Sequence, residues 1–326
     1  MSITRFTPDS SRSVLGLGLA LFSAATFATA GSFADSLMAT GWSPAAVVSF
    51  RITIAALLLT LPALRALRGQ WQLLRAAVPS VLAFGFVAVA GCQLFFFNAV
   101  QRLDVGVALL LEYSGILLVV LWLWARHGHR PRRLTVIGGV AALGGLVLVL
   151  HPAGGGIDAV GVFWGLLAGT GLATYFVLSS KTDDVLAPIV LAWAAMCVGA
   201  LTLIVCDLVH VVPFRTETGE VELLHHHMSW IVPIIGLSLV AAAIAYASGI
   251  AATRRLGAKL ASFVGLTEVL FAVLFAWAFL GQAPGAWQLV GGVVVLGGIA
   301  LVRADDTEVE LAASEPALAT QAVEPA

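Results

Sequence analysis

Long runs of uncharged residues limit most strongly what this chain can fold into. Runs of 22 to 26 residues without Asp, Glu, Lys or Arg recur along the chain, and two further runs have 31 and 34 residues. A helix needs about 20 mostly apolar residues to cross a bilayer, so each run is long enough for a span. Only 11% of the 326 residues are charged and the mean hydropathy is +0.99, whereas soluble domains carry about 25% charged residues. The sequence therefore predicts an all-α integral membrane protein.

Charges and turn signals divide these runs into ten predicted transmembrane helices. The longest run is interrupted at 281–285, where proline and glycine residues favour a turn. Arg51 and Glu112 each lie inside an otherwise apolar stretch, and a further stretch carries Lys259 at one end and Glu268 inside. The spans are predicted at 14–38, 44–64, 76–100, 104–125, 134–151, 157–180, 186–207, 228–252, 258–280 and 285–302.

The distribution of Lys and Arg predicts the orientation of the chain. With the N-terminus inside, fourteen of these residues lie on the cytoplasmic side and only Arg102 and Arg215 lie outside. The positive-inside rule therefore predicts that both termini are cytoplasmic, and we expect the protein in the plasma (inner) membrane. The first span is also compatible with a cleaved signal peptide, since Ala28-Thr29-Ala30 is a small-residue cleavage motif. The internal repeat described below favours a retained span.

The two halves of the chain are related by an internal repeat. A shift of 153 residues aligns 102–149 with 255–302 at 18 identical positions of 48, including a tryptophan, a proline and two pairs of glycines. Each half, 14–151 and 157–303, holds five predicted spans, and an odd number of spans inverts one copy relative to the other. Two inverted five-helix repeats are an architecture of secondary transporters. The alternative is a duplicated membrane scaffold without transport activity.

The segments at both ends of the chain are expected to lie outside the membrane. Residues 1–13 are predicted as a cytoplasmic N-terminus. Residues 304–326 are acidic and lack apolar periodicity, so they are predicted to be a solvated, disordered tail.

Small residues follow one face of the fifth and tenth spans. Gly138, Ala142 and Gly145 share a face, as do Gly291 and Gly298. Such spacing lets helix backbones approach closely in a membrane. We expect these faces to pack within one chain, although the same pattern is compatible with the seam of a homodimer.

Several motifs carry a resemblance to a known family. The pair Phe50-Arg51, the run Leu109-Leu110-Leu111-Glu112-Tyr113, the motif Trp122-Leu123-Trp124 and the glycine pairs of the fifth and tenth spans resemble the EamA family of the drug/metabolite transporter superfamily. The resemblance extends over both repeats and implies a ten-helix exporter of amino acids or other metabolites. This family often has proline at the positions of Ile116 and Val269, so the resemblance does not extend to a helix break at these points.

Three ionisable residues lie inside predicted spans, where charges are costly and mark functional sites. From the outer ends of their helices, Arg51 lies roughly 10 Å deep and Glu112 roughly 12 Å deep at the helical rise, which predicts an ion pair. Glu268 lies about 15 Å from the inner end of its helix, near the midplane, and no cation within the spans remains to pair with it. We therefore expect Glu268 and Glu112 to take part in proton coupling. The structural alternatives are an ion pair that only joins two helices, and a permanently protonated Glu268 bonded to a neighbouring helix.

Polar and aromatic residues at similar depth are candidates for the wall of a substrate site, together with Arg51. For each of them, ordinary helix packing is the alternative. They are Gln93, Asn98, Tyr113, Thr174, Tyr175, Trp193 and Tyr246.

No pattern for a catalytic, metal or cofactor site is found in the sequence. The run His225-His226-His227 lies in the longest outer loop without a helically spaced partner, so a solvated loop is expected rather than a zinc site. The three cysteines lack CxxC spacing. With a formal net charge of −1, the chain offers no general basic field for nucleic acid.

The sequence thus predicts a transporter that exports a small metabolite by alternating access, with the lipid bilayer as its surroundings. Two alternatives come from other classes: a polytopic membrane enzyme acting on lipid, and a non-transporting scaffold. The enzyme would need clustered His, Asp or Ser residues near one interface, and the basic 126–133 loop is the only hint of one.

Overall fold

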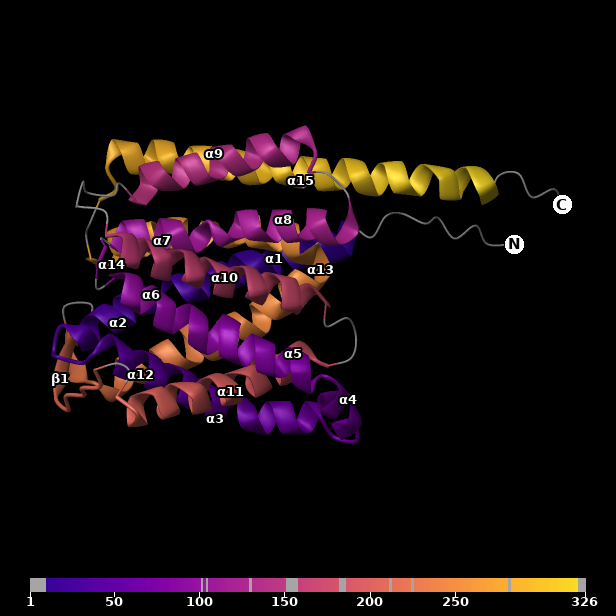
Figure 1. Ribbon diagram of the computed structural model, residues 1–326. Coiled ribbons are helices and arrows are strands. Elements are labelled where there is room, and N and C mark those ends of the chain that lie inside the picture. The colour runs from indigo at the N-terminus through magenta and orange to yellow at the C-terminus, as the bar shows by residue number, and fades with distance from the viewer. Residues whose placement is uncertain are drawn as a thin grey trace.

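The protein is a bundle of long helices with one small β-hairpin (Figure 1). The computed structural model describes residues 10–100, 102–103, 105–128, 131–150, 158–181, 186–210, 213–223, 226–280 and 283–321. The β-hairpin lies at one end of the bundle, called here the hairpin end. Helix α1 begins and α15 leaves the bundle at the opposite end, the termini end (Figure 1).

The elements follow one another along the bundle, with short segments between long helices. The first repeat contains α1 (Ser10–Ala28), α2 (Ala30–Met38), α3 (Pro44–Ala66), α4 (Trp71–Ala76), α5 (Val78–Ala83), the π-helix η1 (Phe84–Gly91), α6 (Cys92–Val100), α7 (Val105–Tyr113), α8 (Gly115–His127) and α9 (Arg133–Leu150). The second contains α10 (Ala159–Lys181), α11 (Pro188–Leu208), β1 (Glu220–Leu223), β2 (His226–Ser229), α12 (Ile231–Ser238), the π-helix η2 (Leu239–Ile244), α13 (Ala245–Gly265), α14 (Thr267–Leu280) and α15 (Ala286–Gln321).

The prediction of an all-α membrane protein with two five-helix repeats is confirmed. Nine stretches of the described residues are long and apolar enough to cross a membrane. One of them, 231–265, holds the predicted eighth span and the start of the ninth, because α13 continues through a kink at Gly257. That residue has φ +77°, a left-handed conformation that glycine adopts without steric cost. Helix α14 completes the ninth span, so the ten predicted segments are all accounted for.

The fourth and ninth spans are each broken beside a glutamate, although neither break contains proline. The fourth span ends one helix at Tyr113 and starts the next at Gly115, and the ninth is interrupted at Leu266. At each break a hydroxyl side chain donates to the carbonyl three residues earlier, Ser114 to Leu111 (2.5 Å) and Thr267 to Val264 (2.7 Å). At the 153-residue shift Ser114 corresponds to Thr267 and Leu111 to Val264, so the two hydrogen bonds are equivalent in the two repeats. Hydroxyl groups that bond the preceding turn compete with the helical ladder, which explains breaks that the sequence analysis did not expect.

The fifth and tenth spans, α9 and α15, pack closely and antiparallel along the predicted glycine faces. A Cβ atom on Gly298 would lie 2.5 Å from the carbonyl oxygen of Gly138, and one on Gly145 would lie 2.7 Å from that of Gly291. Under the 153-residue shift Gly138 corresponds to Gly291 and Gly145 to Gly298, so each contact maps onto the other. Such reciprocity indicates a two-fold relation between the repeats. The predicted packing within the chain is therefore confirmed.

At the termini end, the structure differs from the expected solvated tail. Helix α15 continues to Gln321, and Asp305 is 2% exposed. Its carboxylate accepts a hydrogen bond from Thr135 and lies 3.4 Å from Lys259 Nζ and 3.9 Å from an Arg132 nitrogen. Most residues from 304 to 321 are good helix formers and none is glycine, and the helix continues through Pro316.

The long loop before the eighth span forms the β-hairpin, which is docked on α2 and α3. Val221 is 1% exposed among apolar residues of α2, α3 and α12, and Trp42 Nε1 donates to the Glu217 carbonyl (2.6 Å). His226 and His227 are exposed on β2, and His225 lies outside the described residues. In the described part of the chain, His, Cys, Asp and Glu side chains form no group of three suited to a metal ion.

Helix α10 begins at a capping aspartate outside the membrane. Asp158 accepts hydrogen bonds from the backbone N–H groups of Gly161 (3.0 Å) and Val160 (2.7 Å), and Arg102 lies 3.6 Å away. These hydrogen bonds, with the nearby guanidinium, lower the pKa of the Asp158 carboxyl.

Candidate functional site

A cavity of about 550 Å³ lies between the two repeats. It extends from the middle of the bundle, at Ala20 and Ala261, toward the hairpin end, at Met38 and Pro44. Residues of α1, α2, α3, α6, α7, α10, α13 and α14 line it, so both repeats contribute. Arg51, Glu112 and Glu268, the three charged residues predicted inside the spans, all line this one cavity. A pocket of this size suits a small-molecule ligand.

Arg51 is held by a backbone group of the second repeat and not by Glu112. Its Nη2 donates to the carbonyl oxygen of Ala241 (2.6 Å), and the side chain is 7% exposed. Ala241 belongs to the π-helix η2, whose hydrogen-bond pattern departs from that of an α-helix. Among the described residues, no ion pair within 4 Å joins Arg51 to Glu112. The predicted ion pair is therefore wrong, because equal depth along two helices does not fix the direction of their side chains.

Glu112 receives a hydrogen bond from a residue that the sequence analysis did not select. Cys92 Sγ lies 3.1 Å from Glu112 Oε1 and 3.5 Å from the carbonyl oxygen of Ala168. Cys92 opens α6 directly after the π-helix η1 and is 6% exposed. Glu112 is the penultimate residue of α7, next to the break, so its side chain is carried by the end of a short helix.

Glu268 lies at the start of α14, just after the break in the ninth span. Its carboxyl group interacts with the hydroxyl of Tyr113, the residue next to Glu112. Each glutamate has a glycine at the equivalent position of the other repeat: at the 153-residue shift Glu112 corresponds to Gly265, and Glu268 to Gly115. Each repeat therefore brings one carboxyl group to the cavity, from opposite sides of its helix break.

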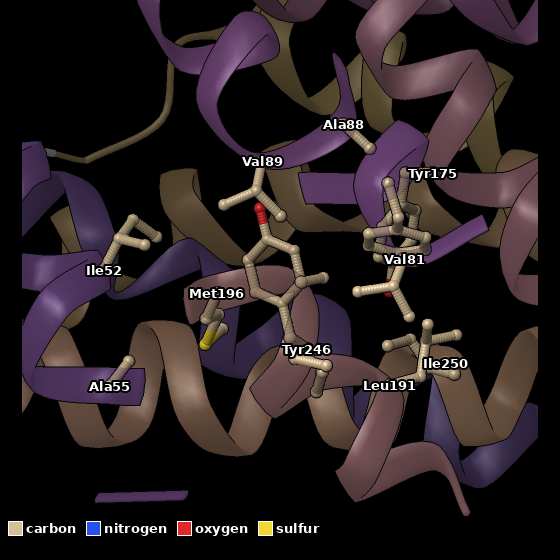
Figure 2. Close-up of a cluster of buried hydrophobic side chains, with 14 of the residues drawn as sticks. Ile52, Ala55, Val81, Ala88, Val89, Tyr175, Leu191, Met196, Tyr246 and Ile250 are labelled. Carbon is tan, nitrogen blue, oxygen red and sulfur yellow. The ribbon is translucent and has the colours of Figure 1, made fainter. Parts of the chain in front are cut away.

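Aromatic side chains surround the charged groups. Tyr246 packs edge-on against Phe27 and Tyr175, with ring centroids 5.1 and 5.6 Å apart, and its hydroxyl interacts with Gln93. In Figure 2 the Tyr246 ring lies within the cluster with its hydroxyl directed toward Val89. Tyr175 is 7% exposed, and its hydroxyl has no hydrogen-bond partner among the described residues.

Five of the eight predicted wall residues line the cavity and three do not. Arg51, Gln93, Tyr113, Tyr175 and Tyr246 line it. The other three bond elsewhere: Asn98 Nδ2 donates to the Leu94 carbonyl, Thr174 Oγ1 to the Thr170 carbonyl, and Trp193 Nε1 to Thr60 Oγ1 (3.0 Å). These helices are apolar on all sides, so the sequence does not show which face is turned inward. Cavity residues that the sequence analysis missed include Ser23, Phe27, Cys92, Phe96 and Phe97.

Comparisons with known proteins agree with this architecture. The sequence model of the EamA-like transporter family matches residues 14–151 and 159–304. An uncharacterized transporter of Archaeoglobus fulgidus is 26% identical over 216 residues, which are 66% of this chain and 72% of that protein. A solved structure, described only as the crystal structure of a protein, is similar with a TM-score of 0.71 and 20% identity, covering 90% of this chain and 97% of that one. The likeness to the solved structure concerns the fold alone.

Proposed function

Because the chain belongs to the EamA-like transporter family, we propose that it exports a small metabolite such as an amino acid by alternating access. It is a multi-pass transporter and not an enzyme, which removes the lipid-modifying alternative. The observation that supports the finer proposal is the cavity shared by the two repeats, with a guanidinium and two carboxyl groups in its wall. A non-transporting scaffold has no need for such a cavity.

The polar groups in the cavity suit a substrate with both donors and acceptors. The Nε of Arg51 and the hydroxyl of Tyr175 are buried donors without a partner among the described residues. A buried donor without an acceptor costs free energy, so a ligand that supplies acceptor oxygens is favoured there. Glu112 and Glu268 offer acceptors for a cationic or hydroxyl group. The zwitterionic head of an amino acid carries both kinds of group, and the aromatic wall suits an apolar side chain.

We infer that the two carboxyl groups couple transport to protons. Glu112 and Glu268 lie on short helices beside a break, α7 and α14, and the two groups interact electrostatically. A substrate cation and a proton would compete for these carboxylates, so binding of one would release the other. The proposal keeps both termini in the cytoplasm, which places the hairpin end of the bundle, toward which the cavity extends, on the outer side of the membrane.

A tolerance screen tests the proposed export. Cells overproducing the wild-type protein are grown on toxic amino-acid analogues and compared with cells that carry Glu112→Gln and Glu268→Gln together. We expect increased tolerance to at least one analogue, and loss of that tolerance in the double variant at equal protein level in the membrane. Equal tolerance in both strains would contradict the role of the carboxyl groups.

A matched control comes from a polar residue outside the cavity. Thr174 bonds only within α10 and is not part of the cavity wall. The variant Thr174→Val should keep the tolerance of the wild type, whereas Tyr175→Phe, at the neighbouring position in the cavity wall, should reduce it.

A further inference from the structure

The thiol of Cys92 faces two acceptors at once. Its Sγ lies 3.1 Å from Glu112 Oε1 and 3.5 Å from the carbonyl oxygen of Ala168 on α10. A thiol has one proton to donate, and its sulfur is also a weak acceptor. Only one of the two oxygens can receive the S–H at a time. The contact therefore has two alternative arrangements that differ by a rotation of the S–H bond.

Two local features of the fold place this thiol against Glu112. The backbone N–H of Cys92 donates to the carbonyl of Val87, five residues earlier, at the end of the π-helix η1. A π-helical turn contains an extra residue, so it rotates the face that α6 turns toward α7. On the other side, a Cβ atom at Gly171 would lie 2.6 Å from the Cβ of Cys92. Glycine at this position of α10 leaves the space that Cys92 occupies.

The second repeat lacks both members of this pair. At the 153-residue shift Cys92 corresponds to Ala245, and Glu112 corresponds to Gly265. The fold of a repeat thus forms without the thiol. Cys92 and Glu112 occur together in the repeat that has them and are replaced together by small residues in the other.

We propose that Cys92 is a positioning residue for Glu112 that keeps its carboxyl group hydrogen-bonded in both protonation states. This inference rests on the proposed function, in which Glu112 takes up and releases a proton. When Glu112 is ionised, the thiol donates to Oε1. When Glu112 is protonated, its O–H donates to Sγ and the thiol proton turns to the Ala168 carbonyl. Each proton stays on its own atom, so no thiolate forms.

Other groups face Glu112 from the elements around it and do not offer this exchange. Arg51 on α3, Glu268 on α14 and Tyr246 on α13 interact with it electrostatically, and Tyr113, its neighbour on α7, interacts with Glu268. A guanidinium donates only, and Tyr113 is already engaged with the other carboxyl group. The thiol is the group whose donor can leave Glu112 and find a second acceptor.

The infrared S–H stretching band of Cys92 tests the proposal without relying on transport. The purified protein carries Cys197→Ala and Cys206→Ala, so Cys92 supplies the only S–H band. We expect the band to shift between low and high pH, and the shift to disappear in Glu112→Gln, whose side chain does not titrate. A band that is unaffected by pH in the protein with Glu112 intact would overturn the proposal.

Transport of a radiolabelled amino-acid mixture in vesicles gives the second measurement. Cys92→Ser keeps a donor and an acceptor and should retain the wild-type pH profile. Cys92→Ala removes both, and the midpoint should move to higher pH by about half a unit or more, roughly a threefold change in proton affinity. Cys206→Ala, on α11 away from the cavity, is the control. If wild type and Glu112→Gln behave as proposed but Cys92→Ala keeps the wild-type midpoint, Cys92 has no positioning role. If wild type shows no pH-driven transport, the proposed function itself fails, and the infrared result still decides the contact.

Discussion

Adding one methyl group at Gly298 should destabilise the protein, whereas adding it at the next residue should not. An ideal Cβ on Gly298 would lie 2.5 Å from the Gly138 carbonyl oxygen, 2.6 Å from the Ala142 nitrogen and 2.8 Å from the Ala142 Cβ. Two of these three atoms belong to the backbone of α9, so no side-chain rotation can relieve the contact. A Cβ on Gly297 would meet no atom within 4 Å.

The magnitude follows from overpacking. Forcing a methyl group into a well-packed contact costs about 1–3 kcal/mol, and replacing glycine by alanine in a helix returns at most about 1 kcal/mol. Because two of the three atoms met are backbone atoms, the upper part of this cost, about 2–3 kcal/mol, applies. Gly298→Ala should therefore destabilise the protein by about 1–2 kcal/mol, while Gly297→Ala should leave it unchanged or slightly more stable. The same contrast is expected between Gly145→Ala and Gly144→Ala, because the seam maps onto itself under the repeat.

The assay measures the midpoint of thermal unfolding in detergent, which is monitored by size-exclusion chromatography of heated samples. We expect Gly298→Ala and Gly145→Ala to lower the midpoint and their neighbours to leave it in place. Equal midpoints for all four variants would refute the close antiparallel packing of α9 and α15. A loss for Gly297→Ala alone would place the seam on the wrong face of α15.

Three further predictions concern charges and orientation. Asp305→Ala leaves Lys259 and Arg132 beside an emptied buried position and should destabilise the protein by about 1–3 kcal/mol. Adding Lys259→Met should recover part of this loss, as measured by the unfolding midpoints of the single and double variants. Strictly additive losses would contradict the pairing of Asp305 with Lys259. Arg51→Lys keeps the charge but presents one nitrogen where the guanidinium presents three, so transport should fall while the amount of protein in the membrane stays normal. An unchanged KM and transport rate would show that the guanidinium geometry is unimportant. In a variant without the three native cysteines, Thr218→Cys should react with an impermeant maleimide added from outside, whereas Gln70→Cys should not. The reverse labelling pattern would overturn the proposed orientation.

The membrane spans could be predicted from the sequence because charges are expensive in a bilayer. The gaps between charged residues mark the ten segments, and the repeated tryptophan, proline and glycine positions mark the two repeats. The contact between the glycine faces was also predictable, because small residues at helical spacing in a membrane typically allow two helix backbones to approach closely.

The helix breaks and the buried Asp305 could not be predicted in the same way. At Ser114 and Thr267 the break depends on hydroxyl groups that bond the preceding turn, and such residues also occur in unbroken helices. Asp305 is buried only because Thr135 and Lys259, distant in sequence, meet it at the termini end. A charge just after a span is normally solvated, so the sequence gives no sign of these partners.

The candidate site was predicted in its charged residues and only partly in its polar ones. Depth along each helix selects Arg51, Glu112 and Glu268 for the same layer, and all three line the cavity. Depth does not give direction, so Arg51 bonds the Ala241 carbonyl instead of Glu112. Cys92 was missed because cysteines in apolar helices usually behave as small hydrophobic residues.

The claim that the cavity carboxyl groups drive transport is tested most directly by Glu268→Gln in reconstituted vesicles. The substitution keeps the size of the side chain and an acceptor for Tyr113 but removes the titratable group. With a pH gradient across the membrane and a radiolabelled amino-acid mixture inside, wild type should show gradient-driven efflux. Glu268→Gln, at wild-type expression, should lose the dependence on the gradient. Full gradient-driven efflux by Glu268→Gln would contradict the account.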